Sequence, residues 1–153
     1  MKILIASDGS KHSKAMVKIF SSNAFASNTR MRIISAYQTS TYIRATAPMG
    51  ALSEYYADAD DKALKIAEET VENAATVLRK IHPKLNIVTT VIDGDPKHVI
   101  VNEAETFGAD LIVIGSHGQG ILSRFLMGSV SHAVALHAKC SVQIVRIKNS
   151  RNQ

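Results

Sequence analysis

The sequence has a single cysteine, few aromatic residues and no long apolar run. Cys140 has no second cysteine to pair with, so an internal disulfide bond is excluded and a reducing compartment is favoured. No apolar run approaches the roughly 20 residues that a membrane-spanning helix needs. No hydrophobic leader with a cleavage site precedes the first predicted strand, and we therefore expect a cytoplasmic protein without a membrane partner.

The sequence also lacks a dense block of like charges, although its formal net charge is +5. The basic residues are spread along the chain, and no arginines interleaved with aromatic residues form a platform for bases. We therefore predict no nucleic-acid partner and interpret the charge as a mildly basic solvated surface, which also suits an anionic small ligand. No Pro/Gly/Ser-rich stretch divides the 153 residues, which predicts one domain over residues 1–147 and a polar tail over residues 148–153.

Strand and helix patterns alternate along the chain. Short apolar runs rich in β-branched residues predict strands at residues 2–7, 30–37, 86–92, 111–114 and 141–147, the third of them a candidate edge strand. Helical periodicity and capping residues predict helices at residues 11–24, 52–81, 96–107 and 130–137. This alternation is typical of an α/β fold in which an open parallel sheet is covered by helices on both faces.

Apolar stripes predict which helix faces are buried. In residues 11–24 the expected stripe includes Met16, Ile19 and Phe20, and in residues 52–81 it includes Ile66 and Leu78. The polar segment over residues 38–51 is long for a loop in a compact domain. It fits either a binding loop or a variable surface insertion.

Glycines directly follow two of the predicted strands, in Asp8-Gly9 and in residues 115–118. In an open parallel sheet, ligands bind beyond the carboxyl ends of the strands at the point where the strand order reverses. We therefore expect the first and fourth strands to be neighbours, with the site above them. Residues 115–131 run from a strand through a Gly-rich loop into a helix, which leaves backbone N–H groups and the positive end of the helix dipole available to an anion.

The spacing in this loop excludes two common phosphate-binding motifs. It is not G-x-x-x-x-G-K-[ST], because no lysine lies between Gly115 and Ser131. It is not G-x-G-x-x-G, because Ser123 stands in place of the third glycine. The loop does match G-x-x-G, nine residues and G-[ST], with Gly118 and Gly128 on either side of the nine.

Several side chains near the loop have a structural as well as a ligand-binding interpretation. Asp8 suits a bond to the first amides of the next helix, but its place at a strand end favours ligand contact. Ser129 and Ser131 suit helix capping and phosphate binding at once. Arg124 fits a phosphate clamp and an exposed loop arginine equally well, whereas His117 is expected to face solvent. The spacing of the histidines predicts no metal site.

Taken together, several segments resemble the universal stress protein family, in its ATP-binding branch. They are residues 3–10 (ILIASDGS), 94–96 (GDP), 109–118 (ADLIVIGSHG), the G-x-x-G-x9-G-[ST] motif and residues 140–145 (CSVQIV). The resemblance implies a Rossmann-like fold whose five strands have the order 3-2-1-4-5. It also implies a homodimer joined through the last strand, where Val142, Ile144 and Ile147 would otherwise form an unprotected edge.

The resemblance further implies an adenine nucleotide, ATP above all, with ADP and AMP left open and with Mg²⁺ carried by the phosphates. The residues implied to bind it are Ala6, Ser7, Asp8 and Ala36 around the base and ribose, Gly115 and Gly118 at the ribose and α-phosphate, and Gly128, Ser129, Val130 and Ser131 at the phosphates. Arg124 joins this set as the candidate phosphate clamp. No residue is predicted to be catalytic.

The predicted function is that of an ATP-binding dimeric sensor or regulator in a stress response. One alternative is a slow ATPase or nucleotidyl-transfer enzyme, against which the sequence shows no clear general base, no Walker lysine and no paired metal carboxylates near the loop. The other is a nucleotide-free dimerisation module, against which the intact glycine motif argues.

Overall fold

The computed structural model describes residues 1–39, 53–118 and 127–147 of the chain, in which strands and helices alternate. The elements are β1 (Lys2–Ala6), α1 (Lys11–Ser21), β2 (Arg30–Tyr37), α3 (Ser53–Ile81), β3 (Asn86–Asp93), α4 (Pro96–Phe107), β4 (Leu111–Gly115), α5 (Ser129–His137) and β5 (Ser141–Val145). The predicted alternation is therefore confirmed. Within the described residues, no helix is both long and apolar enough to cross a membrane.

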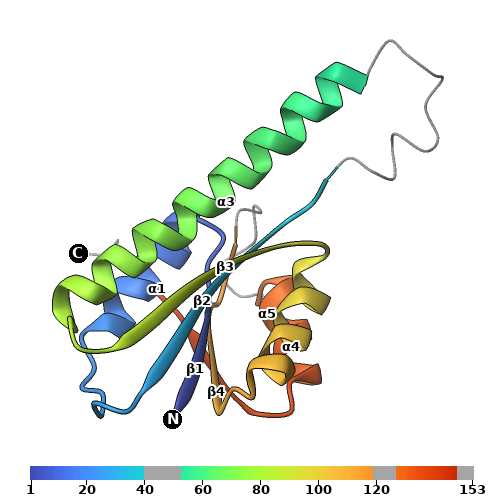
Figure 1. The fold of residues 1–153 in the computed structure, drawn as a ribbon. Coiled ribbons are helices and arrows are strands. Elements are labelled where there is room, and N and C mark those ends of the chain that lie inside the picture. Colours follow the sequence, from blue (N-terminus) through green and yellow to red (C-terminus); the bar gives the residue numbers. More distant parts are fainter. Residues whose placement is uncertain (40–52, 119–126, 148–153) are drawn as a thin grey trace, which may run out of the picture.

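The five strands form one open, parallel sheet with the order β3-β2-β1-β4-β5. This is the predicted order, and β1 and β4 are neighbours as expected, with Ile5 of β1 between Ile33 of β2 and Val113 of β4. Figure 1 shows α1 and α3 on one side of the sheet and α4 and α5 on the other. The strand order reverses between β1 and β4, and these strands are followed by helices on opposite sides of the sheet, so the loops after them diverge there.

Each face of the sheet has its own core, because successive side chains of a strand point to opposite faces. Ile3 and Ile5 of β1 pack in the cluster under α1 and α3, whereas Leu4 and Ala6 pack in the cluster under α4 and α5. Both clusters include side chains that are fully buried. The continuous apolar run in β1 therefore reflects a strand that is covered on both sides.

The buried stripes of α1 and α3 differ from the sequence prediction. Val17 is buried on α1, while Ile19, predicted to be buried, is 48% exposed. Leu78 on α3 is buried as predicted, but Ile66 is 58% exposed. The helical period was therefore identified correctly, while the boundaries of the buried faces were not.

Several element ends also differ from prediction. The helix α1 ends at Ser21 rather than at residue 24, because Ser22 takes the C-cap position, its N–H bonds back to the Ile19 carbonyl and the N–H of Asn23 bonds back to the Phe20 carbonyl. The strand β1 ends at Ala6 and β5 at Val145, so Ile147 lies beyond the last strand. The strand β3 lies at one edge of the sheet, as expected, and β5 at the other.

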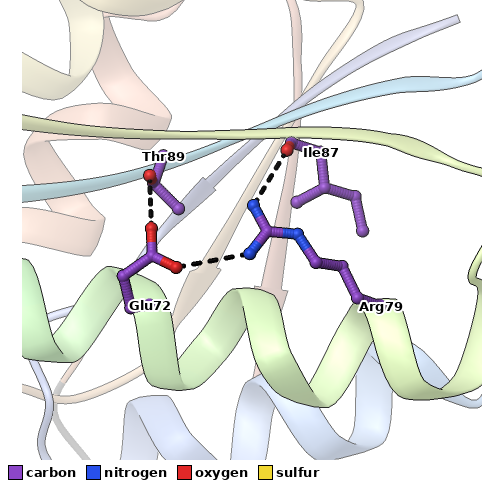
Figure 2. Close-up of polar contacts among 4 residues, drawn as sticks. All are labelled: Glu72, Arg79, Ile87 and Thr89. Atoms are coloured by element: carbon purple, nitrogen blue, oxygen red, sulfur yellow. Dashed lines mark hydrogen bonds and ion pairs between the residues drawn. The ribbon is translucent and has the colours of Figure 1, made fainter.

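Side chains from α3 bind the edge strand β3 directly (Figure 2). The Thr89 hydroxyl donates to one carboxylate oxygen of Glu72 at 2.6 Å, and Arg79 donates to the other at 3.3 Å. Arg79 also donates to the backbone carbonyl of Ile87 at 3.2 Å. These contacts occupy polar groups along an edge that would otherwise offer them to another strand.

We expect the contact of Glu72 with β3 to make stability depend on pH. The hydrogen bond from Thr89, together with Arg79, lowers the pKa of Glu72 below its ordinary value, although burial acts in the opposite direction. A carboxyl whose pKa is lowered in the folded state stabilises that state above its ordinary pKa, and this contribution disappears as the pH falls through the lowered pKa. Unfolding by urea at pH 7, 5 and 3 should therefore show Glu72→Gln closest in stability to the wild type at pH 3.

The matched control is Glu68→Gln, at an exposed glutamate of the same helix. It should retain the wild-type dependence of stability on pH. A stability difference between wild type and Glu72→Gln that stayed constant from pH 7 to pH 3 would contradict the assignment.

Candidate functional site

A cavity of about 370 Å³ opens at the carboxyl ends of β1, β2 and β4, where the strand order reverses. The residues that line it are Ala6, Ser7, Asp8, Ser13, Ile34, Ala36, Tyr37, Gln38, Pro96, Ile100, Ile114, Gly115, His117, Gly118, Gly128, Ser129, Val130 and Ser131. Its position is the one predicted from the glycines that follow β1 and β4.

Ten of the eleven residues predicted to bind a ligand line this cavity: Ala6, Ser7, Asp8, Ala36, Gly115, Gly118, Gly128, Ser129, Val130 and Ser131. The eleventh, Arg124, lies outside the described residues. So do residues 40–51 of the segment at 38–51, which fits either a binding loop or a surface insertion. These ten residues come from four separate segments of the chain that meet at one cavity. The contact of these residues with a ligand stays a prediction.

The carboxylate of Asp8 lies between the start of α1 and the loop after β4. One oxygen, Oδ1, accepts a hydrogen bond from the backbone N–H of Ser10 at 3.0 Å. The other, Oδ2, lies 2.8 Å from the position that a Cβ atom on Gly118 would occupy. Asp8 thus does bond an amide at the start of the next helix, and a glycine at 118 permits its close approach to the loop.

The first turn of α5 lines the cavity, and no side chain caps the start of this helix. Its N-cap residue is Gly128, whereas Ser10 caps α1 and Asp95 caps α4 through side-chain oxygens. In the described part of the chain, no hydrogen bond satisfies the backbone N–H groups of Ser129 and Val130. These donors and the positive end of the helix dipole make the α5 end of the cavity suitable for an anion.

The hydroxyl of Ser131 is already occupied within the protein. It donates to the Gly128 carbonyl at 2.9 Å and lies 3.3 Å from the Ser116 carbonyl, and the residue is only 2% exposed. A serine hydroxyl has one proton, so this one is not available to a phosphate oxygen. If Ser131 contacts a phosphate, the donor is its backbone N–H group. Ser129, by contrast, is exposed.

His117, which was expected to face solvent, is half-buried and forms part of the cavity wall. Its Nδ1 lies 2.9 Å from the Ser116 hydroxyl, and its ring centroid lies 5.6 Å from that of His12 on α1. Beside His117, the N–H of Gly128 bonds to the Ser116 carbonyl at 2.8 Å.

An apolar part of the cavity wall was largely missed from the sequence. Ile34 and Tyr37 of β2, Pro96 and Ile100 of α4 and Ile114 of β4 line it. The turn at residues 94–96 could have indicated this part of the cavity, because it follows the carboxyl end of a parallel strand, as Asp8 does. The cavity therefore joins an apolar chamber to an anion-binding end.

The described residues offer little for metal or thiol chemistry. Among them, no group of three or more His, Cys, Asp or Glu side chains is placed to hold a metal ion. Burial raises the pKa of the Cys140 thiol, and the residue packs against the apolar cluster under α4 and α5. Such a thiol is a poor nucleophile.

Comparison with known proteins gives a consistent result. The model of the universal stress protein family matches residues 1–146. A Staphylococcus epidermidis protein named as a universal stress protein is 31% identical over 145 residues, which cover 94% of this chain and 82% of that protein.

Two solved structures extend the comparison. Hypothetical protein MJ0577 is 25% identical, with a TM-score of 0.81 and 97% of each chain covered. A universal stress protein solved in complex with cAMP is also 25% identical, with a TM-score of 0.65, and the match covers 97% of this chain and 98% of that one. The chain described here belongs to the universal stress protein family.

Proposed function

We propose that this protein binds an adenine nucleotide, ATP above all, in the cavity between β1 and β4 and acts as a dimeric regulator in the cytoplasm. The observation that carries the proposal is the composition of the cavity, which joins an apolar chamber to the uncapped start of α5. A nucleotide has the same division, with a flat base at one end and an anionic phosphate group at the other. The relative solved with cAMP supports a nucleotide of this class.

The base is assigned to the apolar chamber, between Ala36 at the end of β2 and Ile100 on α4. Asp8 then lies beside the ribose, and the phosphates reach the backbone N–H groups of Ser129 and Val130. Arg124 is proposed as a further phosphate contact. Magnesium is assigned to the phosphates rather than to the protein, because the described residues hold no group of metal-binding side chains.

The edge strand β5 is the proposed dimer contact. Val142 and Ile144 are partly buried against the cluster under α4 and α5, so their side chains are held by their own protomer. What β5 offers a second protomer is its backbone edge, with Ile147 just beyond it. Pairing of two such edges would cover both. Nucleotide binding would regulate a partner by favouring one conformation over another.

Titration calorimetry with ATP and AMP, each with and without Mg²⁺, tests the nucleotide assignment. We expect saturable heat, and a rise in the free energy of unfolding of about 2.7 kcal/mol when free nucleotide is at 100 times its dissociation constant. Hydrogen exchange should show slowed exchange of the amides of Ser129 and Val130 when nucleotide is bound. Adenosine and inorganic triphosphate are the control ligands, and each should bind more weakly than ATP. The absence of heat and of stabilisation at millimolar ATP would overturn the proposal.

A further inference from the structure

Three serines form a hydrogen-bond network at the junction of β1 and α1. The hydroxyls of Ser7 and Ser13 lie 3.2 Å apart, and the Ser13 hydroxyl lies 3.1 Å from the backbone carbonyl of Ser10. The Ser10 hydroxyl accepts from the N–H of Ser13 at 3.1 Å. Ser7 and Ser13 are 7% and 3% exposed, and both line the cavity. We call Ser7, Ser10 and Ser13 the serine network.

The direction of the hydrogen bonds in the serine network follows from counting protons. Each hydroxyl has one proton, and the Ser10 carbonyl can only accept. If Ser13 donates to that carbonyl, Ser7 donates to Ser13 and both protons have an acceptor. If Ser13 instead donated to Ser7, the Ser7 proton would need an acceptor that no described residue is seen to supply. Because buried polar groups are costly to leave unpaired, the first arrangement is the more stable one within the protein.

We infer that the serine network holds the Ser7 hydroxyl as a hydrogen-bond acceptor, so that the cavity selects ligands that place an N–H or O–H donor against it. With its own proton directed to Ser13, Ser7 presents only lone pairs to the cavity. A ligand acceptor at this point would have to turn the Ser7 proton away from Ser13 and break the buried bond. Ser13 is therefore a positioning residue that acts through Ser7.

The residue next to Ser7 also presents a hydrogen-bond acceptor. That acceptor is the Asp8 carboxylate, and the amides at the start of α5 are donors. Ser7 and Asp8 thus form an acceptor wall on the β1 side of the cavity. In a nucleotide, the groups that suit the acceptor wall are the amino group of the base and the ribose hydroxyls. This inference rests on the proposed function and specifies which part of a nucleotide the site can distinguish.

The test compares ligands that differ by one donor, in the wild type and in Ser13→Ala. AMP is paired with purine riboside 5′-monophosphate, in which hydrogen replaces the amino group, and with 2′-deoxy-AMP and 3′-deoxy-AMP, which each lack one ribose hydroxyl. For the pair whose donor meets Ser7, the preference for AMP should fall by about 3- to 10-fold in Ser13→Ala, the range expected for one neutral hydrogen bond. The other pairs should keep their wild-type ratios, so the experiment also identifies the donor.

Ser21→Ala is the matched control. Ser21 is fully buried on the same helix, and its hydroxyl bonds to the Lys18 carbonyl at 2.8 Å, the same local bond that Ser13 makes to Ser10. It does not line the cavity. Ser21→Ala should therefore change stability while leaving every ligand ratio at its wild-type value. Ser7→Ala removes the acceptor itself and should reproduce the altered ratio even if Ser13→Ala does not fold.

The possible outcomes separate this inference from the function on which it rests. If the wild type binds none of these nucleotides, the proposed function is overturned, and the inference with it. If the wild type binds AMP but all ratios are unchanged in the folded variants, only the inference is overturned. A ratio that falls in Ser13→Ala and Ser7→Ala, but not in Ser21→Ala, supports it.

Discussion

Replacing Gly128 by valine is expected to weaken nucleotide binding by at least about 100-fold. A Cβ atom at this position would lie 3.2 Å from the Ser116 carbonyl oxygen and 3.5 Å from Cα of His117, and valine adds two methyl groups beyond it. The loop after β4 and the start of α5 must then move apart, which breaks the bond from the Gly128 N–H to Ser116. Two charge-assisted hydrogen bonds to phosphate, worth about 1.5 kcal/mol or more each, would be lost together.

Two further variants separate this effect from a general loss of stability. Gly128→Ala adds only the Cβ atom, so the loop needs to shift by a few tenths of an ångström and the affinity should fall by a smaller factor. Gly108→Ala is the control for stability, because Gly108 ends α4 with a φ of 65°, which costs a non-glycine residue about 1–2 kcal/mol. Gly108 does not line the cavity, so calorimetry should find that Gly108→Ala binds nucleotide with wild-type affinity. Wild-type affinity in a folded Gly128→Val would refute the assignment of the phosphates to α5.

The position of the site could be predicted from the sequence because it depends on chain order. Buried strands, each followed by a turn and a helix, allow few topologies, and the handedness of the crossovers reduces them further. Glycines directly after β1 and β4 then indicate where the chain has to turn sharply beside a ligand. For this reason Asp8, Gly118 and Gly128 were placed together correctly although they lie far apart in the sequence.

The internal hydrogen bonds of the site could not be predicted in the same way. From the sequence, Ser13 is an ordinary polar residue in the first turn of a helix. It belongs to the site because the end of β1 places the Ser7 hydroxyl 3.2 Å from the Ser13 hydroxyl. The contacts of His117 with the Ser116 hydroxyl and with His12 depend likewise on the three-dimensional arrangement. Residue types and spacing do not determine such side-chain directions.

Helix α3 shows a second limit of sequence patterns. A period of 3.6 residues groups Ile66 with Leu78 on an apolar side of the helix, but the sheet covers only part of that side. Ala67, Ala74 and Ala75 are buried together with Val71 and Leu78, while Ile66 remains 58% exposed. The apolar side predicted from the sequence is therefore wider than the side that the structure buries.

This difference between Leu78 and Ile66 leads to a prediction about stability. Leu78 has no exposed surface and packs in the cluster between α3 and the sheet, together with Met31 and Ile87. Leu78→Ala removes three carbon atoms from a site that cannot collapse completely, which should lower the free energy of unfolding by about 2–5 kcal/mol. Ile66→Ala, on the same helix but at the surface, should change it by no more than about 0.5 kcal/mol. Urea unfolding of the two variants beside the wild type measures both effects.

The same two variants also test whether the packing of α3 affects nucleotide binding. No described residue of α3 lines the cavity, so Leu78→Ala should bind nucleotide with wild-type affinity at temperatures where it is still folded. The apolar cluster that holds α3 would then support the sheet without shaping the site. The apolar chamber of the site lies on the opposite face of the sheet and is formed by Ile34, Ile100 and Ile114. Equal stability losses in Leu78→Ala and Ile66→Ala would contradict the packing of α3. A reduced affinity in folded Leu78→Ala would mean that strain passes through the sheet from one core to the other.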